Sequence, residues 1–261
     1  MSAETARRIP ADLGRTAGAA GVGALIVVWW ALAAAGTAGG TIPTPWRVLS
    51  AMWSDGWGLY GPNFQVTAIG ALQGFLWGNA LAIGIAALIM LVPRIEPLAT
   101  QLAILSYCTP LVALGPIILV VFGGRTPTVF LAAMYCFFTT MVGAVSGLRS
   151  ADPASLDLVR AYGGGRWQQL YRVRSIAALP NTFAALKIAA PSAVLGAIIG
   201  EYLGGVDSGI GVALTAAQTA YNVPRTWGMA IAAAALAGLG YLLVAGAARL
   251  ITPWTTVAER R

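Results

Sequence analysis

The residue types that most often carry out chemistry are scarce in this sequence. Its 261 residues include no histidine, and its two cysteines, Cys108 and Cys136, each lie inside an apolar run. The chain therefore has no imidazole to act as a general base, proton relay or metal ligand, and two such thiols do not suggest a disulfide framework. Neither a metal-ligating cluster nor a serine paired with a base stands out. We predict no catalytic residue and no metal site.

The composition predicts a membrane protein. Hydrophobic residues make up 58% of the chain and charged residues 10%, whereas soluble domains average about 45–50% and about 25%. The 32 glycines and 14 prolines lie among long apolar runs, where membrane helices tolerate both residues better than soluble helices do. A soluble domain could not bury this much apolar surface.

Six apolar segments are long enough to cross a bilayer, which takes about 20 residues. They cover residues 19–38, 64–91, 97–122, 128–148, 180–203 and 227–250, and Pro110 and Pro116 interrupt the third. The first segment could instead be a cleaved signal peptide, but its length and the Trp29-Trp30 pair favour a retained span. The sequence therefore predicts an all-α membrane protein, with residues 1–261 forming a single domain of six transmembrane helices.

The arginines indicate how the chain is oriented. With a cytoplasmic N-terminus, all arginines except Arg47, Arg125 and Arg225 fall on the inside. Because basic residues concentrate in cytoplasmic loops, we expect both termini in the cytoplasm. On the outside, residues 41–63 are too polar to cross, and Pro45 stands where a first helical turn begins. The apolar spacing that follows predicts a short amphipathic helix on the outer face, separate from the second span.

The longest polar connection is the cytoplasmic loop at residues 149–179. Asp152 before Pro153 is a good N-cap with proline at the first helical position, so a helix is predicted through Tyr162. The run Gly163-Gly164-Gly165 ends it, and the spacing of Trp167, Leu170, Tyr171 and Arg174 predicts a second amphipathic helix. The glycines lack the G-x-x-x-x-G-K-[ST] pattern of a phosphate-binding loop. The loop is thus predicted to be a two-helix knob without a nucleotide site.

This loop resembles the cytoplasmic signature of the permease subunits of bacterial ABC importers, in which E-A-A is followed by three residues and a glycine. The signature and its continuation fall on Asp157, Leu158, Val159, Arg160, Ala161, Tyr162, Gly163, Gly164 and Gly165. Asp157 replaces the usual glutamate, Leu158 and Val159 replace the alanines, and Ser175-Ile176 stands where Leu-Pro is usual. The segments 42–45 and 200–214 also look like the nitrate, sulfonate and taurine branch of these permeases, which includes importers of thiamine precursors.

The resemblance covers nearly the whole chain and implies a function. It implies a type I importer fold in a bacterial inner membrane, with coupling helices at residues 157–165 that enter a groove on a separate cytoplasmic ATPase. That ATPase would hold ATP and Mg, so no cofactor is expected in this chain. A second permease copy would complete a homodimer, and an extracytoplasmic solute-binding protein would supply the solute. No nucleic-acid partner is expected.

Two charged residues lie at membrane depth, where charge is costly and usually functional. Glu201, near the outer end of the fifth span, either lines the translocation pathway, fixes an outer gate, or is held by outer-face water or by hydrogen bonds from neighbouring helices. Lys187 in the same span is expected to extend its amine to the inner interface. This supply of ionisable groups is small for the alternative function, a secondary transporter or channel driven by an ion gradient.

Uncharged polar residues are also candidates for the lining of the translocation pathway. Gln73 and Tyr107 are predicted to line the translocation pathway, although hydrogen bonding between helices is a competing role. Gly70, Gly74 and Gly78 recur every four residues in the second span, which predicts close helix packing either between subunits or within one. A solvated connector bound to anionic lipid remains the alternative for the basic cytoplasmic loop.

Overall fold

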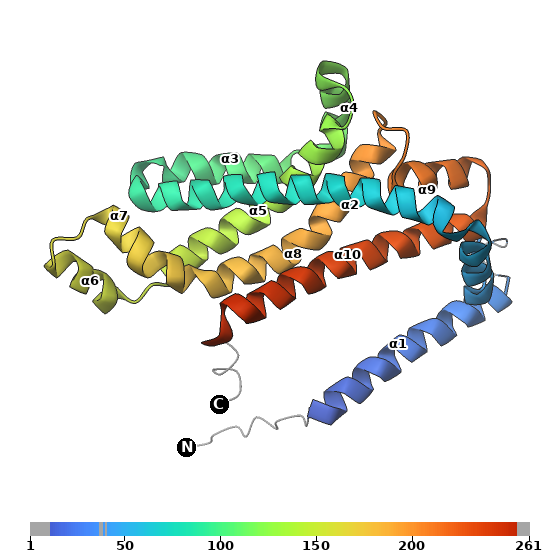
Figure 1. Cartoon of the computed structure of the whole chain (residues 1–261), viewed down its shortest axis with the longest axis horizontal. Coiled ribbons are helices and arrows are strands. Elements are labelled where there is room, and N and C mark those ends of the chain that lie inside the picture. The colour runs from blue at the N-terminus through green and yellow to red at the C-terminus, as the bar shows by residue number, and fades with distance from the viewer. Residues whose placement is uncertain (1–10, 37–38, 40, 255–261) are drawn as a thin grey trace.

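A computed structural model describes residues 11–36, 39 and 41–254 (Figure 1), and within these ranges the chain is helical and contains no strand. Four helices are long and apolar enough to cross a membrane: α2 (Pro45–Leu91), α5 (Thr126–Arg149), α8 (Ser175–Tyr202, extended at its start) and α10 (Val223–Ile251). The bent pair α3 (Glu96–Cys108) and α4 (Leu111–Phe122), which follows the short 3₁₀ turn η2 (Pro93–Ile95), is a fifth crossing if the two helices form one broken span, and a re-entrant loop otherwise. The predicted all-α membrane fold is confirmed.

Helix α5 lies at the centre of the bundle, against α2 and α8, because small residues let the backbones approach closely. A Cβ added to Gly74 would lie 2.3 Å from the Cβ of Ala132, and one added to Gly78 would lie 2.3 Å from the carbonyl oxygen of Ala133. From the other side, a Cβ on Gly196 of α8 would lie 2.7 Å from the Cα of Ala132. The glycine repeat of α2 therefore packs within this subunit.

Helix α2 consists of two helical parts, the predicted short helix that begins at Pro45 and the second span, which meet at a kink. The side chain of Thr44 caps α2 at its start by accepting a hydrogen bond from the Arg47 backbone, and Pro45 occupies the first turn as predicted. The helix bends at Gly56, whose φ of 64° is open to glycine and strained for other residues. The predicted short helix before the second span is therefore present, but it ends at Gly56, so the second span begins there rather than at residue 64.

The third predicted span, residues 97–122, breaks at one of its two prolines. The axes of α3 and α4 differ by 91°. Pro110 disfavours a helical conformation at the preceding residue, and Thr109 is extended, with ψ of 130°. Pro116 instead lies inside α4. As a result, α4 projects away from the other helices (Figure 1).

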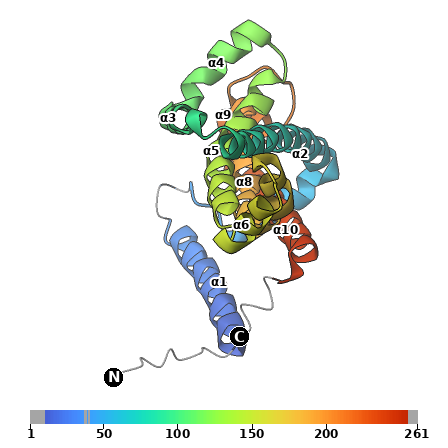
Figure 2. The ribbon, with the colours of Figure 1, turned by 90° about the vertical axis from the view of Figure 1, so that its left-hand side faces the viewer.

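Helix α1 (Ala11–Ala34) begins before the first predicted span, 19–38, and residues 37 and 38 lie outside the described residues. At its end, Trp29 stacks on Trp227 of α10 with ring centroids 5.3 Å apart, and Trp29 Nε1 donates to the Pro43 carbonyl over 3.0 Å. From there α1 runs away from the bundle (Figure 2). Its apolar described part, Gly23–Ala34, is shorter than a span, so the sixth crossing stays a prediction.

The loop at residues 149–179, predicted to be cytoplasmic, contains α6 (Pro153–Ala161), α7 (Arg166–Gln169) and the π-helical turn η3 (Leu170–Arg174). The second predicted loop helix is not separate from the fifth span, because residues Arg166–Tyr202 form one continuous helix. Gln169, Leu170, Arg174 and Ser175 all have helical dihedral angles, so nothing ends the helix at this point. Pro180, predicted at the start of the span, lies inside α8.

Candidate functional site

The hairpin, defined here as α6, α7 and the turn between them, is shaped by its cap and its glycines. The Asp152 carboxylate accepts hydrogen bonds from the hydroxyl and the backbone N–H of Ser155, over 2.9 and 3.0 Å. Both hydrogen bonds hold the pKa of the Asp152 carboxyl below its ordinary value, and the bond from the Ser155 hydroxyl has the larger effect. Gly163 has φ of 77°, and a Cβ on Gly164 would lie 2.4 Å from Val159 Cγ1. The predicted cap and glycine break both occur.

The tip of the hairpin exposes apolar side chains, among them Tyr162 at 86% and Leu158 at 59% of their surface. A groove of about 240 Å³ is lined there by Leu158, Val159, Tyr162, Gln168 and Arg172. Asp157 pairs with Arg160 at 2.9 Å, but both side chains are more than half exposed, and such pairs contribute little to stability. The predicted signature residues therefore lie together on an exposed surface.

Two arginines tie the base of the hairpin to the bundle. Arg166 donates to the carbonyl of Leu91 at the end of α2 over 3.2 Å, and Arg174 donates to the carbonyl of Leu148 near the end of α5 over 2.9 Å. The last carbonyls of a helix have no partner within the helix and attract positive charge. Sequence reasoning missed both anchors, because each depends on a partner about 26 or 75 residues away.

Glu201 lies at the opposite end of α8 and is only 1% exposed. Its Oε2 accepts hydrogen bonds from the Thr67 hydroxyl and from the backbone N–H of Gly211, each over 2.9 Å. Its Oε1 has no hydrogen-bond partner among the described residues. Hydrogen bonds from neighbouring helices, one of the alternatives for this residue, therefore hold the carboxylate in this subunit. That Glu201 lines a pathway stays a prediction.

The partners of Glu201 come from α2 and from the start of α9 (Ile210–Thr219). Thr67 Oγ1 also accepts from the N–H of Ile210 over 2.8 Å, and Asn63 Oδ1 accepts from the N–H of Gly209 over 2.8 Å. A Cβ on Gly209 would lie 2.4 Å from the Cδ of Glu201. Sequence reasoning missed this cluster, although the Gly-x-Gly spacing directly before an apolar helix was a usable signal for a close approach.

The structure does not bring the remaining predicted pathway residues together with Glu201. Gln73 is exposed on α2, and Tyr107 lies in α3 with its side chain outside what the structure describes. Lys187 is half-buried in α8. Asn79, another polar group of α2, accepts a hydrogen bond from Thr140 of α5, so it joins two helices of one subunit.

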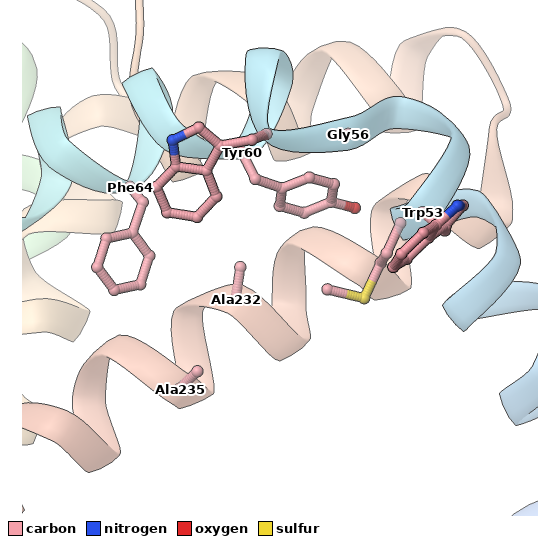
Figure 3. A pocket seen from close by; sticks show the side chains of 8 residues that line it. Trp53, Gly56, Tyr60, Phe64, Ala232 and Ala235 are labelled. Carbon is pink, nitrogen blue, oxygen red and sulfur yellow. The ribbon is translucent and has the colours of Figure 1, made fainter.

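An aromatic pocket of about 500 Å³ opens between the outer part of α2 and α10 (Figure 3). Its lining consists of Met52, Trp53, Gly56, Trp57, Tyr60, Phe64, Ala232 and Ala235. The Tyr60 hydroxyl is buried and has no hydrogen-bond partner among the described residues. Near it Arg225 and Asp55 form an ion pair, with Nε and Oδ2 2.8 Å apart. Such a pocket offers flat apolar faces to a ring-shaped molecule.

Comparison with known proteins identifies the kind of molecule to which these features belong. A family model described as a binding-protein-dependent transport system inner membrane component matches residues 78–257. A probable ABC transporter permease protein of Haemophilus influenzae is 28% identical over 208 residues, which cover 77% of this chain and 82% of that protein.

Two further relatives carry transport names. The riboflavin transport system permease protein RibX of Chloroflexus aurantiacus is 28% identical over 234 residues, 88% of this chain and 87% of that protein. The formylaminopyrimidine transport permease protein ThiX of Halalkalibacterium halodurans is 29% identical over 182 residues, 68% of this chain and 72% of that protein. The chain therefore belongs to the binding-protein-dependent transport system inner membrane components, and is a multi-pass permease subunit of an ABC importer.

Proposed function

We propose that this permease is driven by a separate cytoplasmic ABC ATPase, which docks on the tip of the hairpin. The observation that carries the proposal is the exposed groove formed by Leu158, Tyr162 and their neighbours. Exposed apolar patches with a polar rim are typical of protein interfaces. Asp157 and Arg160 supply such a rim. ATP and Mg belong to this partner, and the chain itself contributes no nucleotide site.

The permease acts as a homodimer fed by an extracytoplasmic solute-binding protein. The family's description as binding-protein-dependent supports the solute-binding protein as a partner. The homodimer is supported by α4, which projects from the bundle, and by α1, which runs away from it (Figures 1 and 2). Both helices leave apolar side chains exposed in the single subunit. The arginine distribution supports a cytoplasmic location for both termini. Approach of the two ATPases would then alternate access to a cavity between the subunits.

The proposed substrate is a small flat heterocycle, with a sulfonate or nitrate-like anion as the second candidate. The names of two relatives refer to riboflavin and to formylaminopyrimidine, both of which are ring compounds. The aromatic pocket beside α10 is lined by rings and apolar groups without a basic side chain, which favours stacking over anion binding. Competition of uptake by unlabelled heterocycles and sulfonates, in proteoliposomes that hold the complete importer, would separate the two classes.

Co-purification tests the ATPase contact. The full-length permease is isolated in mild detergent from its native membrane, and its partners are identified by mass. A stoichiometric ABC ATPase is expected, and its recovery should fall at least about tenfold in Tyr162→Ala, because interface aromatics often contribute 2 kcal/mol or more.

Tyr221→Ala is the matched control, since Tyr221 is 91% exposed but lies in the turn before α10, remote from the hairpin. This variant should retain the ATPase. If the unaltered permease brings down no ATPase, or if both variants behave alike, the docking surface proposed here is wrong.

A further inference from the structure

A second cavity of the cytoplasmic side lies between the hairpin and the inner end of α2. Its volume is about 440 Å³, and it is lined by Met90, Pro93, Arg160, Arg166, Gln169 and Arg174. None of these residues lines the groove at the hairpin tip. We call this space the basic cavity. Of its lining residues only Arg160 also belongs to the proposed ATPase contact, which therefore does not account for Arg166 or Arg174.

The arginines of the basic cavity are fixed in place without being neutralised. Arg166 and Arg174 each donate from Nη1 to a backbone carbonyl at a helix end, and Arg174 Nη1 also lies 3.5 Å from the sulfur of Met90. A guanidinium has five N–H donors, so most donors of both groups remain for another partner. A carbonyl carries no net charge, and the full positive charge of each arginine remains.

Within the part of the chain that the structure describes, no carboxylate forms an ion pair with Arg166 or Arg174. Among the described residues, the ion pairs near the inner face are Arg160 with Asp157 and Arg149 with Glu96, whereas Arg166 and Arg174 have no carboxylate within 4.0 Å. Arg160 lines the same space and shares its charge with an exposed partner. Like charges gathered at one cavity favour an anion there.

Gln169 adds an uncharged polar group to the lining of the basic cavity. The residue is only 6% exposed, and its amide atoms are not among the buried side-chain atoms that lack a hydrogen-bond partner. A side-chain amide can both donate and accept hydrogen bonds, so Gln169 complements the guanidinium groups in binding an anion.

We propose that the basic cavity binds a phosphate-bearing anion, supplied by the head group of an anionic lipid in the inner leaflet. Guanidinium groups bind phosphate oxygens in pairs of parallel hydrogen bonds. Met90 and Leu91 end the apolar span of α2, so the cavity lies where the head groups of the cytoplasmic leaflet begin. Basic pockets at this depth between membrane helices are suited to anionic lipids. A soluble phosphate has the same chemistry and is the other source to be tested.

Lipid retention in nanodiscs tests the site. The full-length permease is placed in phosphatidylcholine nanodiscs with increasing phosphatidylglycerol, and retained lipid is counted by native mass spectrometry. One tightly held phosphatidylglycerol is expected, with affinity about tenfold lower in Arg166→Gln, because hydrogen bonds to charged groups contribute about 1.5–3 kcal/mol. Arg249→Gln is the control, since Arg249 is an exposed arginine in the last turn of α10 and does not line the cavity. It removes the same charge and should leave retention unchanged.

A second arm separates the two sources. Inorganic phosphate is added to neutral nanodiscs, and thermal unfolding is followed for the same proteins. Stabilisation of the unaltered protein but not of Arg166→Gln would support the site with a soluble phosphate as its ligand. Equal lipid retention in both variants, together with no effect of phosphate, would overturn the proposal. Unchanged lipid retention in Arg166→Gln, together with reduced co-purification of the ATPase by the same variant, would also overturn the proposal. Arg166 would then belong to the contact with the ATPase.

A failure of Arg166→Gln to fold does not prevent the test. A photo-reactive residue in place of Met90, which lines the cavity, keeps all three arginines. Irradiation in phosphatidylglycerol nanodiscs should attach that lipid, and the attachment should exceed that from a photo-reactive residue at Leu250, an exposed position on α10. Equal attachment at the two positions, with no protection by phosphate, counts against the site.

Discussion

Charged side chains at both ends of α8 are stabilised by backbone groups at the ends of neighbouring helices, but the two ends carry charges of opposite sign. At the outer end, the Glu201 carboxylate accepts hydrogen bonds from Thr67 and from the first turn of α9. At the inner end, Arg166 and Arg174, in the helical extension of α8, donate to carbonyls at the ends of α2 and α5. Negative charge meets a helix N-terminus outside, and positive charge meets helix C-termini inside, as the helix dipoles favour.

The two ends of α8 also differ in how tightly neighbouring atoms pack around the charged side chains. Around Glu201, glycines touch the carboxylate, and a Cβ on Gly209 or Gly211 would lie within 3 Å of neighbouring atoms. Around the inner arginines a cavity of about 440 Å³ remains. The outer end is therefore a closed cluster that tolerates little change, whereas the inner end has room for a ligand.

The largest effect is expected for Gly200→Ala, which tests whether the outer end is closed. A Cβ there would lie 2.4 Å from the Cα of Thr128, so α8 and α5 would have to separate, at a cost of about 3 kcal/mol. Thermal unfolding in detergent measures it. Gly84→Ala is the control, because a Cβ at Gly84 meets nothing within 4 Å. Equal stability of the two variants would show that the outer packing is looser than described.

Glu201→Gln asks what the outer carboxylate does. Loss of its charge-assisted hydrogen bonds from Thr67 and Gly211 is expected to lower stability by about 2 kcal/mol, whereas Thr67→Ser keeps a hydroxyl and should change little. Uptake in proteoliposomes, corrected for the amount of folded protein, is the second measurement. Reduced uptake by folded Glu201→Gln would favour a place in the pathway, and undiminished uptake would contradict it.

At the inner end, Gly163→Ala is expected to destabilise the hairpin by about 1 kcal/mol. Gly163 has φ of 77°, which side chains other than that of glycine rarely adopt, although a Cβ there meets nothing. Gly165→Ala also adds a methyl in open space, but at φ of −80°, so it should be neutral. Hydrogen exchange of the hairpin amides distinguishes them, and equal exchange rates would refute a requirement for the left-handed turn.

The smallest effect concerns pH and Asp152. Hydrogen bonds from Ser155 lower its pKa in the folded hairpin, so its stabilising effect is present above the unfolded pKa of about 3.9 and is lost as pH falls through the folded pKa. Hairpin protection, corrected for intrinsic exchange, should stay level down to about pH 5 and then decline. Asp152→Asn should flatten this decline, whereas Asp157→Asn should not. The same acid-induced decline in Asp152→Asn would rule out this cap as its cause.

Features that depend on neighbouring residues were predictable from the sequence. The apolar runs located the long helices, and Asp152-Pro153 with the glycine run located the hairpin, because caps and backbone freedom act within a few residues. The bend at Thr109-Pro110 followed from proline for the same reason. The continuation of α7 into α8 was missed, since whether a helix continues depends on what it packs against. The start of the second span at the Gly56 kink was also not predicted.

For the two charged clusters, the sequence indicated the charged residues but not the residues that surround them. Glu201 stood out because it lies at membrane depth, but its partners Thr67 and Gly211 lie 134 and 10 residues away. The arginines of the basic cavity were visible as part of a basic loop, without any sign that they converge beside Gln169. Periodicity identifies which face of a helix is apolar, but it does not say which helices become neighbours.

The continuity of Arg166–Tyr202 has a mechanical consequence. This helix has 37 residues and, at about 1.5 Å per residue, is about 55 Å long. If the proposed ATPase docks on the hairpin, this helix would transmit the movement of the hairpin along the full length of α8 to the end at which Glu201 lies. A tilt of a few degrees at one end displaces the other by several ångström. The π-helical turn at Leu170–Arg174 is the irregular point at which this helix can bend. Its stiffness would determine how much of a movement of the hairpin is transmitted to the far end of α8.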